Sequence, residues 1–117
     1  MIRKSLSVLL ALVMLLCAGS ALASCQDKNS DFKVGFIFLH DENSTYDLNF
    51  MNDANETCEA LGFKKTQFIF KTNIPEDQKC LEAAVDLVEQ GCSIIFADSF
   101  GHEDYMIEAA KKYPNVQ

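Results

Sequence analysis

The sequence has few basic residues, no tryptophan and only two prolines. It contains 10 lysines and arginines against 17 aspartates and glutamates, for a formal net charge of −7. Arg3 and Lys4 lie at the very start, so the chain beyond residue 24 carries a charge of about −9. A protein that binds the phosphate backbone needs a basic stripe, which this acidic chain does not provide. We therefore expect no nucleic-acid partner.

Motifs of several enzyme classes are also missing. No GxSxG nucleophile elbow occurs, and no serine has an evident base. Glycine is scarce, with 5 residues, and the first predicted strand is followed by HDENST instead of the glycine-rich turn that admits a pyrophosphate. The sequence thus predicts a protein that is not an enzyme and that carries no cofactor.

The cysteines of the chain beyond residue 25 do not have the pattern of a metal site either. Cys58, Cys80 and Cys92 stand singly among apolar neighbours, without the CxxC spacing of a zinc site. An odd number permits one disulfide at most. We expect all three to be small buried residues.

Residues 1–24 differ in composition from the rest of the chain. After the basic start, residues 9–17 form an apolar run that is too short to span a bilayer and is typical of a secretory signal peptide. The segment LASC at 22–25 matches the bacterial lipobox, which predicts that Cys25 is acylated; ordinary cleavage, leaving Cys25 as a thiol, is the alternative. We expect a signal peptide over 1–24 and a lipid-anchored tether over 25–32, on the extracytoplasmic face of the cell membrane.

A strand and a helix alternate three times from residue 33 onward. Apolar runs at 34–39, 68–70 and 93–97 have strand length, and a segment of helical apolar spacing follows each. Gly62, Gly91 and Pro114 mark the predicted helix ends. The sequence predicts an α/β fold with a Rossmann-like parallel sheet of order 2-1-3. The first helix should bury a stripe formed by Tyr46, Phe50, Ala54, Cys58 and Leu61.

Two polar segments follow the strands that should lie side by side. HDENSTYD (40–47) follows the first strand and DSFGHED (98–104) follows the third. In an open parallel sheet, the ligand crevice lies beyond the carboxyl ends of the strands where the winding reverses. The two segments should meet at one crevice, with KTNIPED (71–77) to its side.

KVGFIFLHDENSTYDLNF and IIFADSFGHEDYMIEAAKKYPNVQ resemble the basic membrane protein family of ABC-transporter substrate-binding lipoproteins, whose better-studied members bind purine nucleosides. The resemblance covers about residues 33–117. It implies a type I periplasmic-binding-protein fold of two hinged lobes, of which 33–117 would be the first part of the N-terminal lobe, in an incomplete chain. It also implies permease and ATPase subunits as partners, and domain closure around a solute.

The resemblance assigns residues to the ligand crevice. Tyr46 stands where the family usually has an aromatic residue that stacks on the base, and Asp47 where asparagine is common. An aromatic face stabilises a bound base by roughly 1–3 kcal/mol, and a carboxylate can accept from ribose hydroxyls. The candidate ligand-binding residues are Asp41, Tyr46, Asn49, Asp98, Ser99 and Phe100.

Structural roles compete for several of these residues. Tyr46 fits the core stripe as well as the crevice, and burial is favoured for Phe100. Ser44 or Thr45 fits the N-cap of the first helix. Asp98 or Ser99 fits a brace of the third loop, and Asn49 fits an exposed position.

Two other functions fit parts of the sequence. His40-Asp41-Glu42 and His102-Glu103-Asp104 have the composition of a divalent-metal site, although neither has the spacing of a strong motif. A lipoprotein that reports its ligand to a membrane receptor would have the same fold as a transport component.

Overall fold

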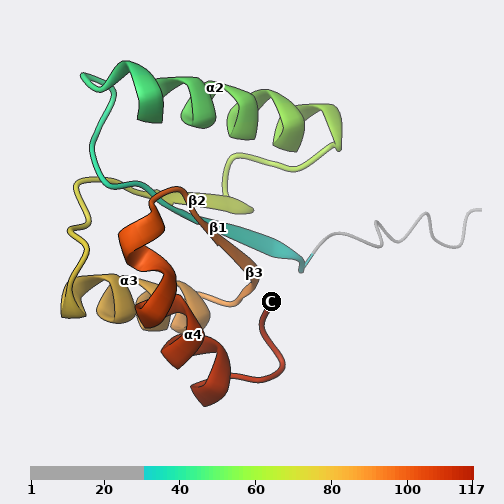
Figure 1. Ribbon diagram of the computed structural model, residues 1–117. Helices are drawn as coiled ribbons and strands as arrows, with labels where there is room; N and C mark the ends of the chain where they lie inside the picture. Colours follow the sequence, from blue (N-terminus) through green and yellow to red (C-terminus); the bar gives the residue numbers. More distant parts are fainter. Residues whose placement is uncertain (1–30) are drawn as a thin grey trace, which may run out of the picture.

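The computed structural model describes residues 31–117 (Figure 1). The strands are β1 (Lys33–Ile37), β2 (Phe68–Lys71) and β3 (Cys92–Ala97), and the helices are α2 (Thr45–Ala60), α3 (Gln78–Glu89), the short 3-10 helix η2 (Phe100–His102) and α4 (Glu103–Lys112). The predicted alternation of strands and helices is confirmed. The predicted signal peptide, Cys25 and the tether up to residue 30 lie outside the described residues.

The strands form one parallel sheet in the order β2-β1-β3. Both neighbours of β1 run parallel to it, with Phe36 opposite Phe70 on one side and opposite Phe96 on the other. This is the predicted 2-1-3 order. It places the carboxyl ends of all three strands at one edge of the sheet.

One face of the sheet carries the main core. Helices α3 and α4 cover this face, while α2 lies across the other (Figure 1). Gly35 in β1 allows α3 to approach closely, because a Cβ atom there would lie 2.8 Å from Cδ1 of Leu87. The fully or nearly buried members of this core are Ile37, Cys80, Leu81, Ala83, Ala84, Leu87, Cys92, Ile95 and Ala109.

The α2 face is less completely packed. The predicted stripe of α2 is wrong in part. Cys58 is buried as predicted, but Tyr46, Phe50 and Leu61 are exposed, and the helix buries Asp47 and Met51, which lie outside the predicted stripe. An open apolar groove of about 630 Å³ lies between α2 and the sheet. We call it the α2 groove; its lining includes Val34, Phe36, Phe50, Ala54, Cys58, Leu61, Ile94 and Phe96.

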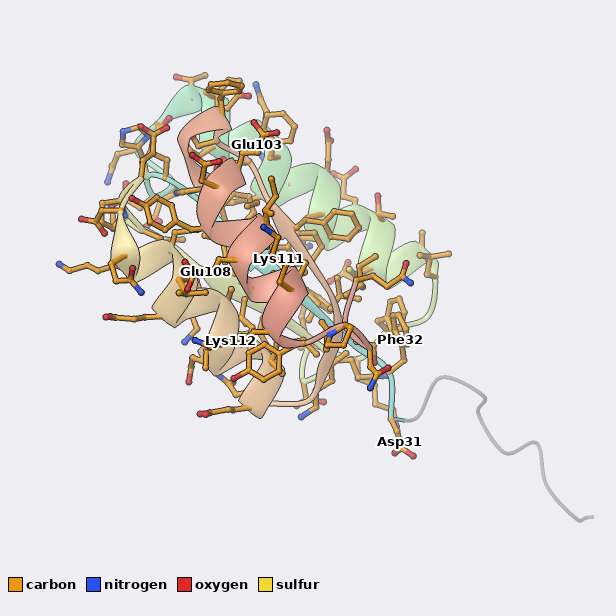
Figure 2. The ribbon with its side chains drawn as sticks, turned by 60° about the horizontal axis from the view of Figure 1, so that its bottom comes forward. Asp31, Phe32, Glu103, Glu108, Lys111 and Lys112 are labelled. Atoms are coloured by element: carbon orange, nitrogen blue, oxygen red, sulfur yellow. The ribbon has the colours of Figure 1, made fainter. Side chains whose placement is uncertain are left out.

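The helix ends follow from local chemistry. Ser44 is the N-cap of α2, and its side chain accepts from the backbone N–H of Asp47. Gly62 and Gly91 follow α2 and α3 with positive φ angles of 82° and 88°, as predicted for residues that end helices. In α4, acidic Glu103 opens the helix and basic residues close it, an arrangement that favours the helix dipole (Figure 2).

The cysteines behave as predicted within the described residues. Cys58, Cys80 and Cys92 are buried and free of disulfides. Burial raises the pKa of the Cys80 thiol to about 11, so this sulfur stays protonated and unreactive at neutral pH. No helix in 31–117 has the length and apolar character needed to cross a membrane.

Candidate functional site

The loops after β1 and β3 meet, as the sequence predicts. The backbone N–H of Leu39 donates to Oδ1 of Asp98 over 3.1 Å, and the N–H of Asp98 donates to the carbonyl of Ile37, also over 3.1 Å. These bonds join segments about sixty residues apart in the chain. Asp98 therefore braces the first loop, whereas the sequence suggested a brace of the third loop.

Asp47 organises the first loop from inside. Its side chain is 1% exposed, and its carboxylate accepts from the backbone N–H of His40 (2.9 Å), from the His40 ring (3.2 Å) and from the Ser44 hydroxyl. Burial opposes ionisation of Asp47, but these hydrogen bonds outweigh burial and hold its pKa well below the usual range. The ionised carboxylate thus fixes the turn that leads from β1 into α2.

The surroundings of Asp98 favour its neutral form, in contrast to those of Asp47. Burial raises its pKa, the N–H of Leu39 opposes this effect, and the neighbouring Asp47 raises the pKa further. Its Oδ2 atom is buried and has no hydrogen-bond partner among residues 31–117. The two aspartates at this edge of the sheet therefore differ in how readily they ionise.

Asp41 lies at the tip of the first loop. Its carboxylate accepts from the backbone N–H of Asn43 (3.0 Å), from the Asn43 amide (2.9 Å) and from the Asn73 amide (3.2 Å). The Asn43 backbone bond and then these side-chain bonds lower the pKa of Asp41. Asp41 is accordingly a negatively charged acceptor in the first loop.

The loop after β2 contributes more than the sequence predicts. Asn73 reaches Asp41, and Glu76 accepts from the Ser99 hydroxyl and, over 3.1 Å, from the backbone N–H of Gly101. Asn73 and Glu76 thus tie this loop to both of the others. The signal that could have identified them is their position after a parallel strand, since all such ends share one edge.

Two aromatic side chains project from this edge into solvent. Tyr46, in the first turn of α2, is 61% exposed, and its ring lies 5.0 Å from that of Phe50. Phe100, which follows β3, is 89% exposed. The core role considered for Tyr46 and the burial favoured for Phe100 are both wrong, because most of each side chain is exposed. Asn49 is also exposed.

The two histidines have different partners. His102 is completely buried, and its Nε2 lies 2.8 Å from the carbonyl of Ile74, which makes this nitrogen the donor. His40 pairs instead with Asp47. Within 31–117, no three His, Cys, Asp or Glu side chains are grouped so that they could hold a metal ion.

A purine-binding protein and a solute-binding protein are similar to this chain. It is 29% identical over 102 residues to a purine-binding protein of Brucella abortus (strain 2308), a match that covers 86% of this chain and 29% of that protein. It also matches the structure of an ABC transporter solute-binding protein from Conexibacter woesei, with a TM-score of 0.62 at 15% identity, over 74% of this chain and 28% of the other. No family model matches the chain.

These similarities confirm the α/β fold and the predicted resemblance to substrate-binding proteins. The names of both relatives describe binding proteins and not enzymes. The chain spans less than a third of the length of either relative.

Proposed function

We propose that the protein is the extracytoplasmic solute-binding component of an ABC importer, and that its ligand is a purine nucleoside or a similarly small aromatic solute. The observation that carries this proposal is the exposure of Tyr46 and Phe100 at the edge where Asp41 holds a negative charge. Aromatic rings left in solvent are suited to stacking on a base, and a carboxylate is suited to accepting from ribose hydroxyls. The purine-binding relative supports the same ligand class.

The proposed site uses the loops at one edge of the sheet. Tyr46 provides a stacking surface, and Asp41 and Ser99 provide polar contacts beside it. Because hydrogen bonds through Asn73 and Glu76 hold the three loops together, this edge is a preorganised binding surface. We propose that a second lobe encloses the solute from the opposite side, and that closure of the two lobes accompanies binding.

We also propose that the protein is anchored to the membrane. Acylation of Cys25 would hold the protein at the outer face of the cytoplasmic membrane, close to the permease and ATPase subunits that take up the solute. Two or three acyl chains give stable anchoring, because each buried methylene contributes about 0.8 kcal/mol.

Calorimetry on the full-length protein tests the ligand class. The titrants are purine nucleosides, sugars, amino acids and divalent metal salts. We expect heat from purine nucleosides, with weaker or no binding of the other classes. Binding of a divalent metal alone, abolished by changes at His40 and His102, would overturn the proposal in favour of a metal-binding protein.

A further inference from the structure

We propose that Asp98 and Asp47 form an acid pair that shares one proton, and that Asp98 positions the ligand-binding loop instead of contacting the ligand. The second half of this proposal depends on the proposed function, whereas the first half does not. Asp98 was predicted from the sequence as a ligand-binding residue, so the proposal gives this side chain a different task.

The geometry places the two carboxyl groups on the same turn of backbone. The consecutive N–H groups of Leu39 and His40 are bound by different carboxyls, Leu39 by Asp98 and His40 by Asp47. One of these aspartates follows β3 and the other lies in the first turn of α2. The pair thus connects both elements to the end of β1.

We assign the shared proton to Oδ2 of Asp98, because this atom has no partner in the described residues. This atom is buried, while Oδ1 of the same carboxyl already accepts from Leu39. The Asp47 carboxyl is bound to the next N–H of the chain and raises the pKa of its neighbour Asp98. Two ionised carboxylates cannot bond to each other, since both are acceptors. A proton on Oδ2 turns this atom into a donor and satisfies it.

Asp47 is the partner that keeps the negative charge. It accepts from the His40 backbone, the His40 ring and the Ser44 hydroxyl, whereas Asp98 accepts from Leu39 alone. A carboxylate with several donors is stabilised in its ionised form. The pair therefore has one neutral member and one charged member, as coupled carboxyl groups commonly do.

The charges around the pair come from three elements. His40 of the first loop faces Asp47, and His102 of η2 favours the ionised form of Asp98 when it is charged. Asp47 of α2 disfavours that form. Among residues 31–117, no lysine or arginine forms an ion pair with either carboxyl. A proton on Asp98 is thus the available means of relieving the repulsion between the two groups.

The acid pair makes the loop sensitive to pH in a defined direction. The folded pKa of Asp98 is raised above its ordinary value of 3.8. Its contribution to stability is therefore complete below that value and is lost as the pH rises through the folded pKa. Above it, two adjacent carboxylates repel each other and loosen the turn from Leu39 to Ser44 that leads into Tyr46.

Carbon-13 NMR of the side-chain carboxyl groups tests the shared proton. The full-length protein is labelled at aspartate and titrated without ligand, and the Asp98 signal is assigned by its loss in Asp98→Asn. We expect a midpoint for Asp98 above 3.8, with a second step in the Asp47 signal at the same pH. A midpoint at or below 3.8 would overturn the acid pair, whether or not any nucleoside binds.

Two substitutions test the positioning role. The amide of Asp98→Asn can donate to Asp47 and accept from Leu39, so it mimics the protonated acid. We expect Asp98→Asn to bind adenosine or guanosine as the wild type does, without the loss of affinity at high pH. Asp98→Ala leaves both partners unsatisfied and should weaken binding by about tenfold. Glu108→Gln, an exposed carboxylate-to-amide change on α4, is the matched control.

The other possible results also test whether Asp98 positions the loop. A folded Asp98→Asn protein that loses binding as severely as Asp98→Ala would show that the carboxylate itself contacts the ligand, and would overturn the proposal. Equal binding by wild type, Asp98→Asn and Asp98→Ala would also overturn it. If Asp98→Ala does not fold, the pH dependence of Asp98→Asn against wild type decides instead.

Discussion

Single side chains at the sheet edge take roles that their neighbours impose. Asp47 and Asp98 are both aspartates of the loops at this edge, yet one is held in the charged form and the other is driven toward the neutral form. The difference arises from the number of donors each carboxyl meets, since burial acts against the charged form of both. For these single residues, the hydrogen-bond partners determine which carboxyl group is charged.

The first prediction concerns the stacking surface. Replacing Tyr46 by Ala should weaken purine nucleoside binding by roughly 1–3 kcal/mol, because the base loses an aromatic face. The Tyr46→Phe protein keeps the ring and serves as the matched control, with near wild-type affinity. Calorimetry on the full-length protein measures both. Unchanged affinity in Tyr46→Ala would assign stacking to another residue.

Stability should respond little to the same change. Tyr46 is 61% exposed and touches Phe50, so its removal buries no unsatisfied group and opens no cavity. Thermal unfolding of Tyr46→Ala alongside wild type separates a lost ligand contact from a lost core residue. A large drop in the unfolding temperature would indicate that Tyr46 is a core residue.

Whole elements pack unequally on the two faces of the sheet. The α3 face is closed around Leu87, Cys80 and Ile37, whereas the α2 face leaves an open groove. A row of phenylalanines crosses the sheet on the groove side, with Phe36 between Phe70 (5.2 Å) and Phe96 (5.5 Å). The sheet is therefore anchored mainly through α3.

The second prediction tests that anchor. The Gly35→Ala change should destabilise the protein by about 1–3 kcal/mol, because the new methyl group would meet Leu87 at 2.8 Å in a tightly packed core. Denaturant unfolding measures the loss. In a Leu87→Ala background, the same glycine change should cost less, since the opposing methyl groups are gone. Equal costs in both backgrounds would contradict close packing at this contact.

At the scale of the whole molecule, the described residues offer one side of a site. The α2 groove of about 630 Å³ is open, and Phe96 within it is 51% exposed. Apolar surface of this kind is usually covered in a working protein. The proposed second lobe would also supply the far side of the ligand pocket.

The third prediction follows from this one-sided site. Residues 26–117 expressed alone should not bind purine nucleosides tightly, because high affinity requires most of the ligand surface to be enclosed. Calorimetry compares this segment with the full-length protein in the same buffer. Equal affinities would refute the need for a second lobe.

The fourth prediction concerns anchoring. Replacing Cys25 by Ala removes the only thiol that the lipobox can present for acylation, and should move the protein out of the membrane fraction and change its migration on a gel. Cys58→Ala, a change at a buried cysteine, is the control and should leave fractionation unaltered. A Cys25→Ala protein that stayed with membranes and migrated unchanged would exclude a lipid anchor at this position.

The sequence by itself determined the elements and their order. Apolar runs of strand length, helical spacing and the glycines at 62 and 91 depend on local backbone preferences, which a short window of residues contains. The parallel order β2-β1-β3 followed because short helical connections permit few arrangements. The convergence of the first and third loops then followed from that order.

Only the tertiary structure decided which side chains of those loops turn inward. Asp47 and His102 are buried, while Tyr46 and Phe100 face solvent, against what hydrophobicity alone favours. The reason is that the polar groups of these loops are satisfied by specific partners, several of which are distant in the chain. Leu39 donates a hydrogen bond to Asp98, fifty-nine residues away, and His102 donates one to the carbonyl of Ile74, twenty-eight residues away. Sequence periodicity carries no information about such pairings, because they depend on how the folded elements pack.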